Sequence, residues 1–152
     1  MEQQTTTERT TAARPSLTIV RQFKAAPERV WQALTLPAQL KQWMGGEGMV
    51  VPIAEADMRV GGRYRIVMRT PSGEEHDVSG TYREVVPNRR LVYTWAWKST
   101  PERESLVTME LRETGGGTEF TLRHEQFFDD DARKRHEQGW GVCVARLERL
   151  LS

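Results

Sequence analysis

The chain has 152 residues, of which 38% are apolar and 28% charged, and its formal net charge is +1. This balance is typical of a soluble globular protein, and the length fits one domain with a substantial core. A nearly neutral chain lacks the basic excess of a nucleic-acid binder. No apolar run approaches the roughly 18 residues that a membrane-spanning helix needs.

The single cysteine, Cys143, excludes an internal disulfide and favours a reducing compartment, so we expect a cytoplasmic protein. Residues 1–16 are rich in Thr, Gln and Glu. Such a composition buries too little apolar surface to fold, and it predicts a disordered tail. Residues 17–152 are then expected to form a single domain.

The first part of this domain predicts one strand and two short helices. Residues 17–24 combine β-branched and aromatic residues with partial alternation, as strands do. Pro27 suits the first position of a helix, and an apolar face follows it. A second short helix is expected to begin at Pro37 and to end at the glycine-rich segment 45–48.

Alternation of apolar and polar residues dominates the middle of the chain. It predicts strands over residues 62–70, 74–86, 91–97, 105–114 and 118–125. In the first of them, Tyr64, Ile66 and Met68 alternate with arginines, so one face is expected to be buried and the other solvated. Short turns join neighbouring strands, which implies an antiparallel sheet of about six or seven strands.

The end of the chain predicts a long helix. Three aspartates, 129–131, supply capping side chains and negative charge at its start. Its apolar stripe comprises Trp140, Cys143, Val144, Leu147, Leu150 and Leu151, and Arg146, Glu148 and Arg149 are expected to face away. A sheet with one apolar face must be covered, and this helix is the large element available. The predicted fold is α+β: a curved antiparallel sheet wrapped around the C-terminal helix, with two short helices after the first strand.

Four segments resemble a known family. They are 26–31, then Asp57 with 59–64, then 80–87 with 90–95, and finally 118–125 followed by Gly139-Trp140. From about Leu17 to Leu151 the chain resembles homologues of the activator of heat-shock-protein-90 ATPase, within the START-like (SRPBCC, birch-pollen-allergen-like) helix-grip superfamily. The resemblance implies a cavity between sheet and long helix. It implies no single activity, because this superfamily includes lipid carriers, hormone receptors, cyclases and co-chaperones.

The inward-facing positions of the strands and the long helix are the candidate ligand-binding residues. They are Tyr64, Ile66, Met68, Val78, Tyr82, Trp95, Val107, Met109, Phe120, Leu122, His124, Trp140 and Val144. Aromatic and methionine side chains at strand spacing usually form a closed core. The alternative, which the resemblance favours, is that some of them line a cavity, where methionine adapts to irregular shapes and Tyr and Trp add a polar group to apolar area.

The three histidines are candidate polar groups. His124 shares the phase of the inward residues around it, so it either contacts a ligand, acts as a general base or is satisfied by neighbouring backbone. His76 lies near a turn and is expected to be exposed, and His136 is expected on a solvated helix face. None of them, nor Cys143, stands at metal-ligand spacing, so neither a metal nor another cofactor is expected.

Two glycines and one arginine leave alternatives open. Gly139 and Gly141 flank Trp140 within the predicted helix, where each costs roughly 1 kcal/mol relative to alanine. Close packing against the sheet would explain them, and so would room for a ligand or a local kink. Arg21 lies in phase with apolar neighbours, and if it points inward it must pair with a carboxylate of the protein or of a ligand.

Three functional hypotheses follow. The preferred one is non-catalytic binding of a small hydrophobic or amphipathic ligand between the sheet and the C-terminal helix. The second is a polyketide-cyclase-like or hydrolase-like enzyme that uses His124. The third is a chaperone-associated protein-binding module in the stress response, which exposure of Trp31 or Trp43 would favour. The expected partner is a small apolar ligand or, in the third hypothesis, a chaperone or other protein, and the protein is expected to be a monomer or a homodimer.

Overall fold

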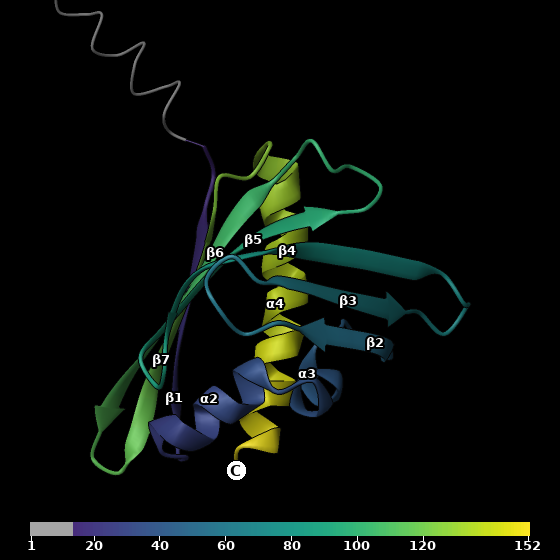
Figure 1. The fold of residues 1–152 in the computed structure, drawn as a ribbon. Helices are drawn as coiled ribbons and strands as arrows, with labels where there is room; N and C mark the ends of the chain where they lie inside the picture. The colour runs from purple at the N-terminus through teal and green to yellow at the C-terminus, as the bar shows by residue number, and fades with distance from the viewer. Residues whose placement is uncertain (1–13) are drawn as a thin grey trace, which may run out of the picture.

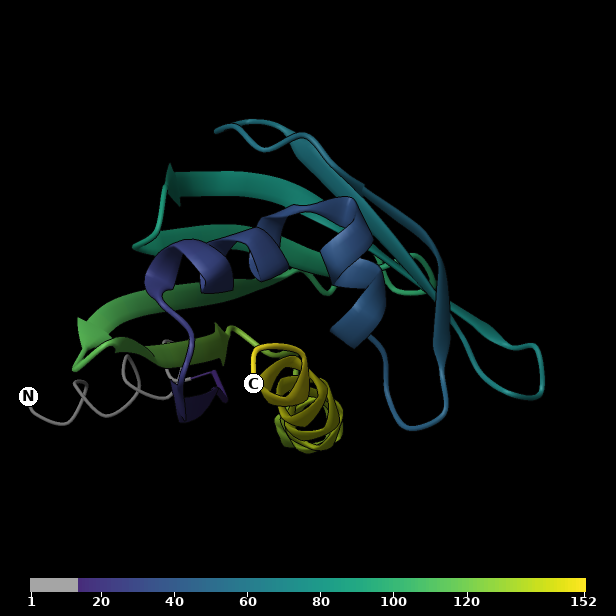
Figure 2. The same cartoon turned by 90° about the horizontal axis from the view of Figure 1, so that it is seen from below.

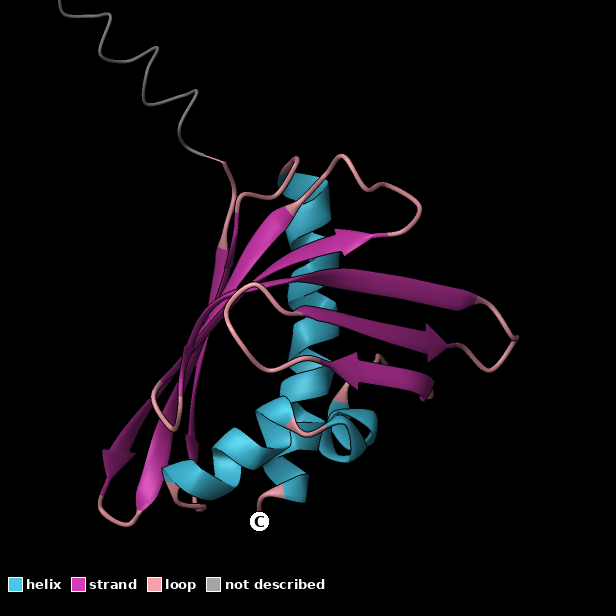
Figure 3. Ribbon diagram, viewed as in Figure 1, coloured by secondary structure: helices cyan, strands magenta, loops and turns pink. Residues whose placement is uncertain are grey.

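A computed structural model describes residues 14–152 (Figures 1 and 3). In chain order, its elements are β1 (Leu17–Phe23), α2 (Pro27–Thr35), α3 (Pro37–Trp43), β2 (Val50–Ala56), β3 (Arg63–Arg69), β4 (Glu75–Val86), β5 (Arg90–Trp97), β6 (Ser105–Thr114), β7 (Gly117–Glu125) and α4 (Asp130–Leu150). The predicted α+β order is therefore present. The predicted N-terminal tail lies outside the described residues over positions 1–13.

All seven strands belong to one antiparallel sheet in the order β1-β7-β6-β5-β4-β3-β2. Strands β2 to β7 follow one another as neighbours, and β1 pairs with β7. Since β1 and β2 lie at opposite edges, the α2–α3 segment that joins them must cross from one edge to the other. Figure 2 shows both short helices on the concave side of the curved sheet, with α4 beside them and seen end on.

A close approach between β4 and β5 accompanies the curvature. Their register shifts between Tyr82 and Glu84, which marks a β-bulge, and a bulge bends its strand and increases its twist. Two residues earlier, a Cβ at Gly80 would lie 1.9 Å from the backbone oxygen of Thr94. The hydroxyl of Tyr64 donates to the same oxygen at 2.6 Å. Only glycine leaves room for this arrangement at position 80.

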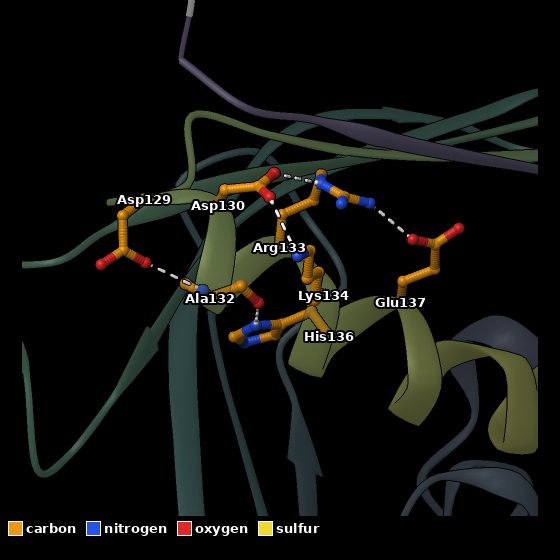
Figure 4. A network of polar contacts seen from close by, with 7 residues as sticks. All are labelled: Asp129, Asp130, Ala132, Arg133, Lys134, His136 and Glu137. Atoms are coloured by element: carbon orange, nitrogen blue, oxygen red, sulfur yellow. Dashed lines mark hydrogen bonds and ion pairs between the residues drawn. The ribbon is translucent and has the colours of Figure 1, made fainter.

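The start of α4 is capped and charged, as its aspartates predict (Figure 4). Asp129 is the N-cap, and its side chain accepts a hydrogen bond from the backbone N–H of Ala132 at 2.8 Å. Asp130 pairs with Arg133, which also pairs with Glu137. The carboxylates of the first turn stabilise the positive end of the helix, whereas the exposed ion pairs are screened by solvent and add little.

The apolar stripe of α4 is buried against the rest of the domain. Its fully buried members are Trp140, Cys143, Val144, Leu147 and Leu151. The prediction that Arg146 faces away is wrong. Its guanidinium donates to the backbone oxygens of Gln42, Met44 and Gly45. These carbonyls lie at and just beyond the C-terminal end of α3, where helical N–H partners are missing, and a cation there satisfies them.

Candidate functional site

A cavity of about 910 Å³ lies between α4 and the sheet and opens to solvent. Its walls come from the loop after α3, from strands β3 to β5, from the loop between β5 and β6, and from α4. The lining residues are Met44, Gly45, Gly46, Met49, Met68, Glu75, His76, Asp77, Trp95, Trp97, Lys98, Ser99, Thr100, Arg103, Arg135, His136, Gly139, Trp140 and Cys143. The volume falls within the range of about 300–1,000 Å³ that small-molecule sites occupy.

The inner wall of the cavity is aromatic and rich in sulfur. Trp95 and Trp140 are 4% and 3% exposed, with ring centroids 5.2 Å apart, and Trp97 meets Trp95 edge to face at 5.4 Å. Met44 and Met68 are buried beside them. Methionine adapts to irregular shapes, so this wall suits apolar groups of several outlines. The buried indole N–H of Trp95 has no hydrogen-bond partner among residues 14–152, and a polar group that reached it would make the missing bond.

The mouth of the cavity is polar. The start of β4 contributes Glu75, His76 and Asp77. The loop after β5 contributes Lys98, Ser99, Thr100 and Arg103, and α4 contributes Arg135. His76 is half-buried at this mouth, with its ring 6.2 Å from that of Trp97, so the expectation of an exposed histidine is wrong. The tryptophan shields one side of the imidazole. The cavity therefore combines an apolar interior with a charged entrance.

His124 is fully buried next to the inner wall and is not part of the lining. Its Nδ1 accepts a hydrogen bond from the indole N–H of Trp140 at 2.9 Å, so its Nε2 carries the proton and donates to the Oγ of Ser105 at 2.7 Å. Ser105 donates in turn to the backbone oxygen of Trp95 at 3.3 Å. Burial, with a smaller contribution from His136, lowers the pKa of His124 well below its usual value.

This hydrogen-bond network favours one of the predicted roles of His124. Both ring nitrogens already have partners inside the protein, and the burial of the ring keeps it neutral. A general base needs a free nitrogen within reach of a substrate proton. The geometry therefore favours the interpretation in which His124 is satisfied by its neighbours, with the difference that the neighbours are side chains.

His136 forms a second pair of imidazole and indole, this time in the cavity wall. Its Nδ1 donates to the backbone oxygen of Ala132, one turn earlier in α4, at 2.7 Å (Figure 4). Its Nε2 accepts the indole N–H of Trp97 at 2.9 Å. Burial lowers the pKa of His136, although the bond to Ala132 opposes the shift. The expectation of a solvated face is wrong because Trp97 and Phe127 cover the ring.

Neither helix glycine is required by packing. A Cβ added at Gly139 or at Gly141 would meet no atom within 4 Å, which argues against close contact with the sheet. Gly139 lines the cavity, whereas Gly141 does not. The alternative of room for a ligand thus fits position 139, where any side chain would extend into space that the cavity now occupies.

The thirteen candidate ligand-binding residues divide into two groups. Three of them line the cavity: Met68, Trp95 and Trp140. The others are buried in the core outside the lining: Tyr64, Ile66, Val78, Tyr82, Val107, Met109, Phe120, Leu122, His124 and Val144. The alternation of the strands identified buried positions correctly. A direct role in ligand binding stays a prediction for all thirteen.

The other side chains considered for function lie away from the cavity. Arg21 is exposed and donates to the backbone oxygen of Val20 at 3.0 Å, so it needs no buried carboxylate. Trp43 is 1% exposed, and its indole N–H donates to the backbone oxygen of Ala33 at 2.8 Å. Trp31 is partly buried against the core. Neither short helix presents an exposed tryptophan to a protein partner.

Within residues 14–152, no three histidine, cysteine or carboxylate side chains come close enough together to hold a metal ion. The same part of the chain contains no helix with an apolar stretch sufficient to span a membrane.

A curved antiparallel sheet around one long helix, with an open cavity between them, defines a helix-grip protein of the α+β class. The sequence comparison then gives the family. Residues 24–152 match the family described as "Activator of Hsp90 ATPase homolog 1-like protein", and the chain belongs to that family. The resemblance predicted from the four segments is therefore confirmed. No match was found among curated proteins.

Solved structures agree with this assignment. A protein from Chromobacterium violaceum is 29% identical with a TM-score of 0.83, covering 90% of this chain and 96% of that chain. The AHSA1 protein from Silicibacter pomeroyi is 31% identical with a TM-score of 0.80, covering 90% and 97%. A protein from Nitrosomonas europaea is 30% identical with a TM-score of 0.77, covering 90% and 93%. The similarity extends over almost the whole of each protein, so it confirms the predicted fold class.

Proposed function

We propose that this protein binds a small hydrophobic or amphipathic molecule in the cavity between α4 and the sheet, without converting it chemically. The observation that carries the proposal is the cavity itself, about 910 Å³ with an inner wall of tryptophan and methionine. Gly139 supports it, because the glycine weakens the helix, has no packing partner and borders the space.

The driving force for such binding is the removal of apolar surface from water. At about 25 cal/mol per Å², a ligand that buries roughly 200 Å² of apolar area gains about 5 kcal/mol before the entropy lost on association is subtracted. Trp95 contributes a buried N–H that has no partner among residues 14–152. A non-catalytic role is supported by His124, whose two nitrogens are both engaged. The single free thiol of Cys143 supports a cytoplasmic setting.

The test places a larger side chain in the wall of the cavity and measures the binding of an apolar probe. N-phenyl-1-naphthylamine, a neutral apolar fluorophore, is titrated into the wild-type protein and into Gly139→Leu and Gly141→Leu. We expect the wild type and Gly141→Leu to bind the probe with the same affinity. Gly139→Leu should bind it at least about tenfold more weakly, because the leucine occupies part of the apolar site.

The two variants are closely matched. Both replace a glycine of α4 that has open space around it, and only position 139 lines the cavity. Circular dichroism and thermal melting of both variants establish that each remains folded. Absence of probe binding by the wild type, or equal binding by the two leucine variants, would show that the cavity is not the binding site.

A further inference from the structure

We propose that the ligand is an amphiphile with one anionic head group, held with its tail against the tryptophan wall and its head at the mouth among Lys98, Arg103 and Arg135. This inference rests on the proposed function, because it names the chemical class of the molecule that the cavity binds. The evidence for this inference is the pairing of the charged residues at the mouth of the cavity.

The two carboxylates of the mouth are already neutralised. Glu75 pairs with Arg69 at 3.0 Å, and Asp77 pairs with Arg65 at 2.9 Å. The hydrogen bond from Arg65 lowers the pKa of Asp77, so this carboxylate stays ionised and paired. Neither arginine belongs to the cavity lining. Both acids are thus engaged by arginines outside the cavity, and Lys98 at the mouth adds a smaller contribution that lowers the pKa of Asp77, so neither acid offers much attraction to a cationic ligand.

The three cations of the mouth lack such partners. Within residues 14–152, neither Lys98 nor Arg135 has a carboxylate within 4.0 Å. Arg103 has only its sequence neighbour Glu102, at 3.9 Å, and its guanidinium lies 3.8 Å from the ring centroid of Phe128. The mouth therefore carries three positive charges, of which only that of Arg103 has a carboxylate within 4.0 Å among residues 14–152, and an anionic group would complement them.

Two distant segments bring these cations together. Lys98 and Arg103 belong to the loop between β5 and β6, which is held by backbone bonds from Lys98 to Asp77 at 2.8 Å and from Arg103 to Thr100 at 3.0 Å. Arg135 comes from α4, near the half-buried His136. The arrangement is partly ordered before a ligand arrives, so less entropy is lost when the head group binds.

The position of these charges selects an amphiphile over a simple anion. The mouth is exposed to water, where a single ion pair is worth little and is screened by salt. The interior is apolar, so an anion without a tail would leave the apolar lining of the cavity uncovered. A molecule that spans both regions gains apolar burial and charge pairing together.

The experiment compares three competitors that share a ten-carbon chain: decanoate, 1-decanol and decylammonium. Each is used below its micelle concentration to displace N-phenyl-1-naphthylamine from the wild-type protein. We expect decanoate to compete about tenfold more strongly than 1-decanol and decylammonium to be the weakest. Raising the salt concentration should reduce the advantage of decanoate and leave 1-decanol unchanged.

The charge variants locate the head group. Arg135→Gln, Arg103→Gln and Lys98→Gln should each reduce the advantage of decanoate two- to fivefold without changing the competition by 1-decanol. Lys134→Gln is the matched control, since this neighbouring cation of α4 pairs with Asp130 and does not line the cavity. Equal competition by decanoate and 1-decanol, stronger competition by decylammonium, or an advantage untouched by the three variants would overturn the inference. Binding of the probe and its loss in Gly139→Leu decide the proposed function separately.

Discussion

At the scale of single residues, two histidines act as acceptors for buried indole N–H groups. His124 accepts from Trp140, and His136 accepts from Trp97. In each pair the other ring nitrogen donates, to Ser105 or to the backbone oxygen of Ala132, which fixes the neutral tautomer. A protonated imidazole has no acceptor to offer, so charging either ring would break its bond to tryptophan. The cavity wall thus depends on two neutral histidines.

This dependence predicts a loss of stability in mild acid. Burial lowers the pKa of both histidines in the folded protein, while in the unfolded chain the value is about 6.5. The unfolded state therefore binds more protons below pH 6.5, and the free energy of unfolding is highest above that pH and falls as the pH decreases. Each histidine that stays neutral contributes a slope of about 1.4 kcal/mol per pH unit.

The measurement is urea unfolding between pH 7.5 and 5.5, a range that stays above the titration of most carboxylates. His136→Gln should show a shallower dependence on pH than the wild type, because one of the two groups no longer titrates. The same slope in both proteins, or no slope in either, would contradict the assignment of His136 as a buried neutral ring.

The phase of a strand could predict the burial of His124, whereas its hydrogen-bond partners could not be predicted. His124 lies in phase with inward neighbours, and it is fully buried as that phase indicates. Its bonds to Ser105 and Trp140 join positions 19 and 16 residues away, which no local pattern records. The charged residues around His136 in the sequence predict a solvated position for it. Its environment is set by Trp97, which lies 39 residues earlier.

At the scale of elements, a glycine of the sheet and a glycine of α4 differ in the space that surrounds them. Gly80 lies where β4 approaches β5, and a methyl group there would overlap the backbone of Thr94. Backbone cannot move aside as the end of a side chain can. A methyl group at Gly141 would meet no atom within 4 Å, so its missing side chain serves no packing purpose. The same substitution should therefore change stability in opposite directions at the two positions.

We expect Gly80→Ala to lower the free energy of unfolding by more than about 4 kcal/mol or to abolish folding, because the methyl group would force β4 away from the backbone of Thr94 in β5. Gly141→Ala should raise it by about 1 kcal/mol, the difference in helix propensity. Chemical unfolding of both variants is the measurement. A Gly80→Ala protein as stable as the wild type would mean that β4 and β5 are not in this contact.

Most of the elements could be predicted from the sequence because their residues alternate or repeat in a simple way. The alternation in β3 and the aspartates before α4 predict those elements within one or two residues. The sequence predicts no range for strand β2, because Pro52 interrupts the alternation of its residues. In the structure, the register of this strand shifts between Val50 and Ile53. Arg146 shows the same limit on a helix: its place beside the apolar stripe predicts that it faces away, whereas it is half-buried and binds the carbonyls of Met44 and Gly45, which follow α3.

At the scale of the whole molecule, the cavity forms where four distant segments fail to fill the space between them. The alternation of a strand predicts which side chains turn inward, and that prediction holds for the core. Whether an inward side chain meets another or meets empty space depends on the curvature of the sheet and on the loops at 45–49 and 98–103. Those loops have no periodic pattern, so the residues of the mouth could not be identified from the sequence.

The reactivity of Cys143 can be used to probe the cavity, since this residue lines the cavity and is the one cysteine of the chain. Its Sγ donates to the backbone oxygen of Gly45 at 3.2 Å, and burial raises the pKa of the thiol to about 11. At pH 7.5 the thiolate fraction is then roughly 100-fold below that of a cysteine with the ordinary pKa of 9.0. Iodoacetamide should label the folded protein roughly 100-fold more slowly than the urea-unfolded chain.

The same reaction tests whether the cavity is the route to the thiol. Saturating N-phenyl-1-naphthylamine should slow the labelling further, and Gly139→Leu should slow it without the probe, because both occupy the space in front of Cys143. Gly141→Leu should label at the wild-type rate. If the probe binds but leaves the labelling rate unchanged, the reagent reaches the thiol by local opening of α4 and the loop after α3, and the cavity wall is less closed than its packing indicates.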